Sequence, residues 1–195
     1  MNNLNELGKL MRMRRLSSVK REEERNIFNI YTYDWLQISC HKYLSESFIE
    51  KYKDRVNWYY ISANQKLSES FIEKYEYLVS WICISSCQQL SESFIEKYRN
   101  RVDWGHISQY QMLSESFIEK HKDSVHWAYI SKFQTLSEDF IEKYKNEVSW
   151  VQISASQTLS ESFIEKYKDE VNWYCIFKCQ KHLSPEFIKK YKHLI

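Results

Sequence analysis

The sequence predicts an all-α fold, an α-solenoid of stacked short helix pairs with one pair in each 23-residue repeat. A nine-residue string, LSESFIEKY at 44–52, returns with few changes along the chain, and tryptophan recurs every 23 residues. Such self-similarity is the signature of a repeat array. The chain of 195 residues has only two glycines and one proline, which disfavours hairpin turns. The full repeats begin at Leu44, Leu67, Leu90, Leu113, Leu136 and Leu159.

The repeats divide the chain into four regions. Residues 1–25, with seven Lys or Arg and four Glu, predict a basic arm or a capping helix. Residues 26–43 form a degenerate first repeat, since their end matches the second half of a repeat. Residues 44–182 hold six tandem helical hairpins, and residues 183–195 form a half-repeat that caps the C-terminal end.

The first helix of each repeat has a well-specified start. Ser45 is a favoured N-cap residue, and the final half-repeat places Pro185 directly after Ser184, where the first helical position tolerates proline. With Ser45 as N-cap, Leu44 and Ile49 occupy the two positions of a hydrophobic staple.

The second helix is predicted at about Trp58–Gln65, because a capping residue precedes each tryptophan. His126 is the weak exception in this series. The competing interpretation is a strand at Val56–Ile61, where β-branched and aromatic residues dominate. The recurring apolar positions break strict alternation, which favours the helix. The predicted caps are Asn57, Ser80, Asp103, Ser149 and Asn172.

Apolar residues at helical spacing predict one continuous core through the array, since neither short helix can bury its apolar stripe alone. In the first full repeat these core residues are Phe48, Ile49, Tyr52, Val56, Trp58 and Ile61. On the opposite, outer face, Glu50 and Lys51 recur unchanged through six repeats. Packing does not account for this recurrence, and recent duplication does.

Divergence between repeats is concentrated on one face of the second helix. Varied side chains on a regular frame are typical of solenoid binding surfaces, and aromatic residues are enriched at interface hot spots. Drift of an unconstrained surface is the alternative interpretation. The predicted partner-binding face comprises Tyr60, Asn64, Cys83, Cys87, His106, Gln109, Tyr110, Tyr129, Lys132, Phe133, Gln152, Ser156, Cys175 and Lys178.

No catalytic residue, metal site or cofactor is predicted. Glycine-rich phosphate loops, metalloprotease motifs and nucleophile elbows are absent from the sequence. The recurring Ser-Glu pairs are explained by helix capping and by the helix dipole. The cysteine pairs 83/87 and 175/179 each supply only two ligands, whereas a structural zinc site normally has four.

The charge balance bears on the partner. Beyond residue 25 the chain carries 21 Lys or Arg and 22 Asp or Glu, which argues against nucleic acid, although base reading by a helical repeat remains the alternative function. We therefore expect a protein partner, with self-association through an uncapped end as a further expectation. Five cysteines, no signal-like segment and no apolar run of about 20 residues predict an intracellular protein without membrane insertion.

The repeat string FIEKYKD, followed by V-x-W-x-x-I-S and Gln as in residues 48–65, resembles uncharacterised tandem-repeat proteins of giant DNA viruses and some phages. The resemblance spans about residues 34–195. It implies a viral origin, a location in the host cytoplasm and a host-facing interaction role. It transfers no functional residue.

Overall fold

The chain is all-α along the part that the structure describes, as the sequence predicts. The computed structural model describes residues 35–41 and 43–194, and every regular element among them is a helix. The predicted N-terminal arm and most of the degenerate repeat lie outside these residues. The chain divides into two compact units, an N-terminal unit (residues 1–88) and a C-terminal unit (residues 89–195).

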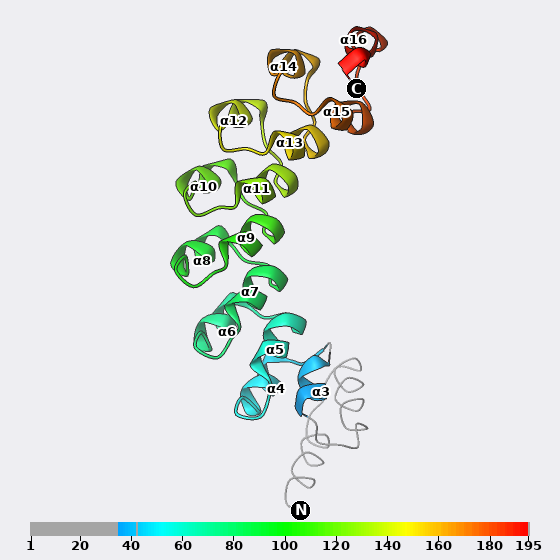
Figure 1. Cartoon of the computed structure of the whole chain (residues 1–195). Helices are drawn as coiled ribbons and strands as arrows, with labels where there is room; N and C mark the ends of the chain where they lie inside the picture. Colours follow the sequence, from blue (N-terminus) through cyan, green and yellow to red (C-terminus); the bar gives the residue numbers. More distant parts are fainter. Residues whose placement is uncertain (1–34, 42, 195) are drawn as a thin grey trace, which may run out of the picture. The chain divides into compact units, whose positions relative to one another are not determined.

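The described part of the N-terminal unit contains five helices. They are α3 (Trp35–Cys40), α4 (Glu46–Lys51), α5 (Trp58–Asn64), α6 (Glu69–Lys74) and α7 (Trp81–Cys87). The first helices of its repeats, α4 and α6, lie in one row, and the second helices α3, α5 and α7 lie in another (Figure 1).

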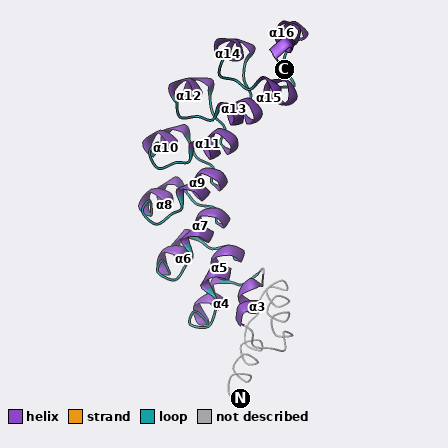
Figure 2. Ribbon diagram, in the orientation of Figure 1, coloured by secondary structure: helices purple, strands orange, loops and turns teal. Residues whose placement is uncertain are grey.

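The C-terminal unit repeats this arrangement. Its first helices are α8 (Glu92–Lys97), α10 (Glu115–Lys120), α12 (Glu138–Lys143), α14 (Glu161–Lys166) and α16 (Pro185–Tyr191). Its second helices are α9 (Trp104–Tyr110), α11 (Trp127–Phe133), α13 (Trp150–Ser156) and α15 (Trp173–Cys179), and a 3₁₀ turn, η1 (Lys192–Leu194), follows α16. Loops alone connect the described helices (Figure 2). One helix pair per 23 residues confirms the predicted α-solenoid architecture.

The predicted caps of the first helices are present. Ser137, for example, accepts a hydrogen bond from the backbone N–H of Phe140 at 3.2 Å, and Pro185 opens α16. The second helices differ, because Asn57, Asp103 and Asn172 cap through their side chains, whereas Ser80 and Ser149 make no side-chain cap bond. These two serines therefore occupy the predicted N-cap positions but do not cap through their side chains.

Backbone geometry explains the two missing caps. At the N-cap of α12 the serine has ψ 154°, whereas Ser149 before α13 has ψ 103°. In this more closed geometry only the longer Asn and Asp side chains reach the free N–H groups of the first turn.

The first helix is shorter than the apolar periodicity predicts. In the first full repeat α4 ends at Lys51, and one further turn brings Val56 into the core. The indole N–H of Trp58 donates to the carbonyl of Lys53 at 2.9 Å, which satisfies a group that an ended helix leaves free. Each later tryptophan from Trp104 to Trp173 makes the same bond five residues back.

The core follows the two isoleucines of each repeat. Ile49 and Ile61 are fully buried and Val56 is buried, while Phe48, Tyr52 and Trp58 are half-buried. In the C-terminal unit each tryptophan packs on the first helix of the next repeat. Trp127, for instance, has its ring centroid 6.4 Å from that of Phe140 and 5.0 Å from that of Tyr144.

The recurrence of Glu and Lys on the outer face has a structural cause that sequence reasoning missed. Glu119 Oε1 lies 2.5 Å from Lys143 Nζ, which belongs to the next repeat, and Glu142 and Lys166 form the equivalent pair. The bond joins residues 24 apart, so it connects successive repeats. The ion pairs are therefore a structural reason for the recurrence of these residues, in addition to duplication.

These ion pairs predict a pH dependence of stability. The bound lysine lowers the pKa of Glu119, Glu142 and Glu165, while the pKa of each partner lysine is raised. A lowered carboxyl pKa stabilises the fold above the unfolded value, and this stability is lost as pH falls through the folded pKa. The stability contributed by the lysines is lost as pH rises through their raised pKa. The carboxyl and lysine contributions are therefore both present between about pH 5 and pH 10.

The measurement is the urea midpoint of unfolding from neutral pH to about pH 3 at low salt. We expect the triple variant Glu119→Gln/Glu142→Gln/Glu165→Gln to lose less stability on acidification than the original chain. Parallel pH curves for the two proteins would contradict a role for these pairs.

Candidate partner-binding face

In the C-terminal unit a buried glutamine ladder fixes α11, α13 and α15 against the preceding repeat. Gln134, directly after α11, accepts the backbone N–H of Leu113 at 3.0 Å. Its amide donates to the carbonyls of Ser108 at 3.0 Å and Gln111 at 2.8 Å. Gln157 makes the same three bonds one repeat later. Both N–H groups of this amide and its oxygen are thus bonded to backbone groups at the junction with the preceding repeat.

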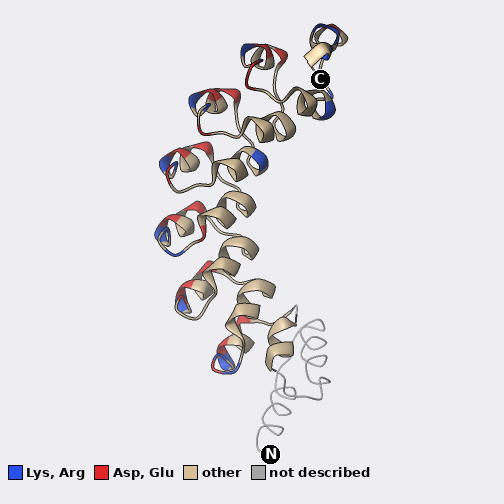
Figure 3. Ribbon diagram, viewed as in Figure 1, with Lys and Arg blue, Asp and Glu red and all other residues tan. Residues whose placement is uncertain are grey.

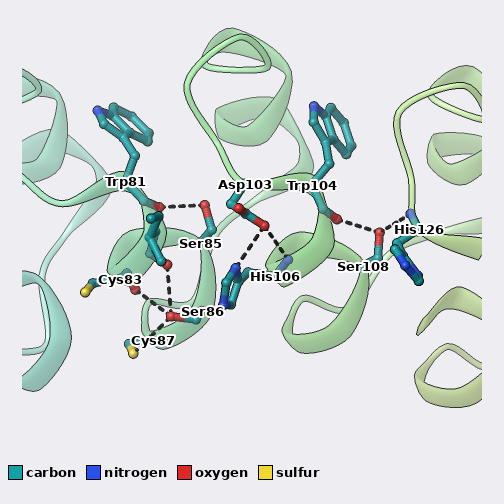
Figure 4. A network of polar contacts seen from close by, with 11 residues as sticks. Trp81, Cys83, Ser85, Ser86, Cys87, Asp103, Trp104, His106, Ser108 and His126 are labelled. Carbon is teal, nitrogen blue, oxygen red and sulfur yellow. Dashed lines mark hydrogen bonds and ion pairs between the residues drawn. The ribbon is translucent and has the colours of Figure 1, made fainter. Parts of the chain in front are cut away.

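In the C-terminal unit a serine in the middle of α9, α11 and α13 forms a second link between repeats, whereas α15 has Phe177 at this position. Ser108 Oγ donates to the carbonyl of Trp104 at 2.6 Å and accepts the backbone N–H of His126 at 2.9 Å (Figure 4). Ser131 and Ser154 form the same link to the following repeats. The next second helix is therefore held at its N-cap residue.

Sequence reasoning did not identify either link. The glutamine recurs in every full repeat and the serine in all but the last, where Phe177 replaces it, but a recurring polar residue has the same appearance in the sequence whether it joins repeats or lies on the surface. Their burial is the observation that separates the two cases. Together the links make a frame on which the variable residues are displayed.

In the N-terminal unit the predicted face is only partly accessible. Asn64 and Cys87 are exposed and Tyr60 is half-buried, but Cys83 is buried. The hydroxyl of Tyr59 lies against this thiol, and the pKa of Tyr59 is raised chiefly by the charge of Cys83 and by their hydrogen bond. Cys83 is therefore not a surface residue.

In the C-terminal unit the predicted face carries most of the exposed aromatic groups. Tyr110, Tyr129 and Phe133 are exposed, and the rings of Tyr129 and Phe133 lie 6.1 Å apart. The other predicted residues follow the same face: Lys132, Ser156 and Lys178 are exposed, whereas His106, Gln109, Gln152 and Cys175 are half-buried.

A further set of exposed residues was not included in the prediction. The position directly after each tryptophan differs between repeats and is 58% exposed at Tyr59 and Ile82, 51% at Val151 and 61% at Tyr174. Their apolar character and their divergence were both visible in the sequence. The i, i+3, i+4 pattern that selected the face excluded them, because it assumed one narrow stripe on a helix only two turns long.

Asp103 and His106 form a local polar pair at the start of α9. Asp103 Oδ1 accepts the backbone N–H of His106 at 2.9 Å, and the ring nitrogen Nδ1 of His106 lies 2.8 Å from the same oxygen (Figure 4). The backbone N–H of His106 is the main cause that lowers the pKa of Asp103. This pair completes a helix cap, so we assign it no catalytic role.

Charge is distributed unevenly between the two helix rows of the C-terminal unit. The first helices carry Lys, Glu and one Asp, whereas α9, α11, α13 and α15 carry no Asp or Glu and only two lysines, Lys132 and Lys178 (Figure 3). Each ammonium lies over a ring of its own helix, 4.9 Å from Phe133 and 5.4 Å from Tyr174. The face is thus apolar and weakly basic.

An open groove of about 420 Å³ lies where α13 and α15 end. Its walls include Ala155 and Ser156 from the end of α13, and Lys181 and His182 from the loop after α15. His182 Nε2 lies 2.8 Å from the carbonyl of Leu159. No carboxylate lines this groove, so it continues the weakly basic character of the adjacent face.

The described residues hold five free cysteines, and no group of three or more potential metal ligands is found among them. None of the helices in residues 35–41 and 43–194 has the length and apolar character needed to cross a membrane. Comparisons with protein-family models, with curated proteins and with solved structures find no match to this chain. The resemblance to viral repeat proteins therefore stays a prediction.

Proposed function

We propose that this chain is a non-enzymatic repeat scaffold whose second-helix face binds a protein partner. The observation that carries the proposal is the contrast within each repeat. The glutamine is constant and buried, as is the serine in every full repeat but the last, while the neighbouring positions on the same helices are varied and, apart from Cys83, exposed or half-buried. A rigid frame that presents different side chains in a row suits recognition of a macromolecule.

The composition of the face supports a protein partner. Exposed Tyr110, Tyr129 and Phe133 are residue types that often supply binding energy at the centres of protein interfaces. Nucleic acid is the second candidate, but a phosphate backbone needs a basic track, and the second helices of the C-terminal unit carry only Lys132 and Lys178. The viral origin and the intracellular location are expectations from the sequence and belong to the same proposal.

The proposal is tested with the triple variant Tyr110→Ser/Tyr129→Ser/Phe133→Ser. We expect it to lose proteins that co-purify with the original chain, while its urea midpoint changes little because all three rings are exposed. Tyr77→Ser is the control, since Tyr77 is 85% exposed and lies outside the second helices. An unchanged set of co-purified proteins would overturn the proposal.

A further inference from the structure

We infer that the partner contributes an extended, acidic segment with two carboxylate side chains about six residues apart, which follows the second-helix face of the C-terminal unit. This inference rests on the proposed function and adds the chemistry of the partner. It concerns the surface from α11 to α15 together with the groove beyond α13.

The two lysines of this face differ from those of the first helices. On the first helices the lysines are held by glutamates of the preceding repeat, as in Lys143 with Glu119 and Lys166 with Glu142. Lys132 and Lys178 are exposed and are not ion-paired to any carboxylate of the described residues. Their charges are therefore available to a partner, and the aromatic rings beside them hold the ammonium groups over the face.

The spacing of the two lysines sets the separation of the carboxylates that would bind them. Lys132 and Lys178 occupy the same position in repeats that are two apart, and Ala155 occupies it in the repeat between them. Helices pack with their axes about 8–10 Å apart, so two repeats separate the lysines by roughly 16–20 Å. An extended chain rises about 3.3 Å per residue, which covers this distance in about five or six residues. Because side chains alternate along an extended chain, only an even separation directs both carboxylates toward the same surface, and this selects a separation of about six residues.

The shape of the surface favours an extended segment over a helix. At the repeat positions of Phe133 and Tyr174 the middle repeat has the smaller Ser156 and Val151, so the middle repeat is the low part of the surface. The adjoining groove of about 420 Å³ has room for a few residues of chain. A helix has a diameter of about 10–12 Å with its side chains, and a helix that spans two repeats would not enter this groove. Apolar residues between the two acidic ones would contact the flanking rings.

The charges favour an acidic peptide over nucleic acid. A nucleic acid carries a phosphate at every nucleotide and needs cations at comparably short intervals. Here the middle repeat offers no cation on its second helix, and residues 89–195 hold fifteen Lys or Arg against fifteen Asp or Glu. Two cations separated by an apolar stretch match two carboxylates, and Lys181 in the groove adds a third positive group at one end.

The test uses fluorescein-labelled peptides of Val, Tyr and Thr that carry two aspartates separated by two, four, six or nine positions. Binding to the full chain is measured by fluorescence anisotropy at low and at high salt. We expect the six-residue separation to bind most tightly, and we expect salt to weaken the binding. Lys132→Gln or Lys178→Gln should each weaken it about fivefold, the size of an exposed charge pair. Lys143→Gln, on the first-helix row, is the control and should leave it unchanged.

A relocated cation makes the test specific for spacing. The double variant Ala155→Lys/Lys178→Gln places the two lysines in neighbouring repeats, and the preferred separation should then fall to about two residues. The inference is overturned by equal affinity for peptides with asparagine in place of aspartate, or by affinity that does not depend on separation. It is also overturned if single-stranded RNA binds at the same salt while the peptides do not.

These outcomes separate the inference from the proposed function. If the aromatic triple variant loses its co-purified proteins but no acidic peptide binds, the face recognises a partner of different chemistry and this inference alone fails. If the triple variant loses nothing and no peptide binds, the scaffold function itself fails.

Discussion

Replacing Gln134 with leucine is expected to lower the free energy of unfolding by about 3–5 kcal/mol. The substitution keeps a side chain of similar size but leaves the N–H of Leu113 and the carbonyls of Ser108 and Gln111 without their partner in a buried site. A buried polar group without a hydrogen bond costs about 1–3 kcal/mol, and three such groups are affected. The expected loss is below the simple sum because local relaxation and water recover part of it.

Gln152→Leu is the matched control, since Gln152 is half-buried on the variable face and forms no part of the ladder. Its effect should be within about 0.5 kcal/mol. The measurement is urea unfolding followed by tryptophan fluorescence and by far-UV circular dichroism. Because the ladder joins repeats, the two probes should also separate in the Gln134→Leu variant, as expected when the cooperativity of an array is reduced. A loss smaller than about 1 kcal/mol would show that the ladder is not a main link between repeats.

The helices were predictable because their signals are local. A capping serine lies next to the helix that it starts, and the apolar residues of one helix lie within a few residues of each other. The period of 23 residues then identifies the fold class without knowledge of any contact. The length of the first helix was not predictable in this way, because it depends on the indole of Trp58 reaching back to the carbonyl of Lys53.

The links between repeats were not predictable from the same signals. The bonds of Gln134 and Ser131 and the pair of Glu119 with Lys143 join residues 18 to 26 apart, in directions that depend on how one helix pair sits on the next. In a chain with nearly identical repeats, recurrence does not distinguish a residue that joins repeats from one that was merely copied. Only the packing of the helices shows which recurring residues join repeats.

The candidate face was predictable in outline only. Divergence located it on the second helices, and the structure places Tyr110, Phe133 and Lys132 on an exposed surface. The burial of Cys83 and the exposure of Tyr174 depend on neighbouring side chains, which a face drawn on an isolated helix does not include. The absence of carboxylates from the second helices of the C-terminal unit was present in the sequence, but it has meaning only when those helices are known to form one row.

Deleting residues 113–135 is expected to preserve a folded, cooperative array, whereas deleting residues 113–124 should destroy the stack in the C-terminal unit. Removal of one full repeat joins Met112 to Leu136 and leaves every link in register. Gln157 then meets the carbonyls of Ser108 and Gln111 in place of those of Ser131 and Gln134, which it contacts in the original chain. A solenoid that packs only on its neighbours should tolerate this change at a small loss of stability.

The shorter deletion removes α10 alone and with it the fully buried Ile118 and the buried Phe117. Trp104 loses the ring of Phe117, 6.3 Å away, and that of His121, 4.8 Å away, so the indole and the core beneath it become exposed. Burial of each large apolar side chain contributes about 1.5–3 kcal/mol, and two neighbouring repeats are affected. We expect loss of a cooperative urea transition and of helical circular dichroism beyond the twelve residues removed. Because the 23-residue deletion removes more of the chain yet should cost less, equal damage from both deletions would mean that the repeat is not the unit that packs.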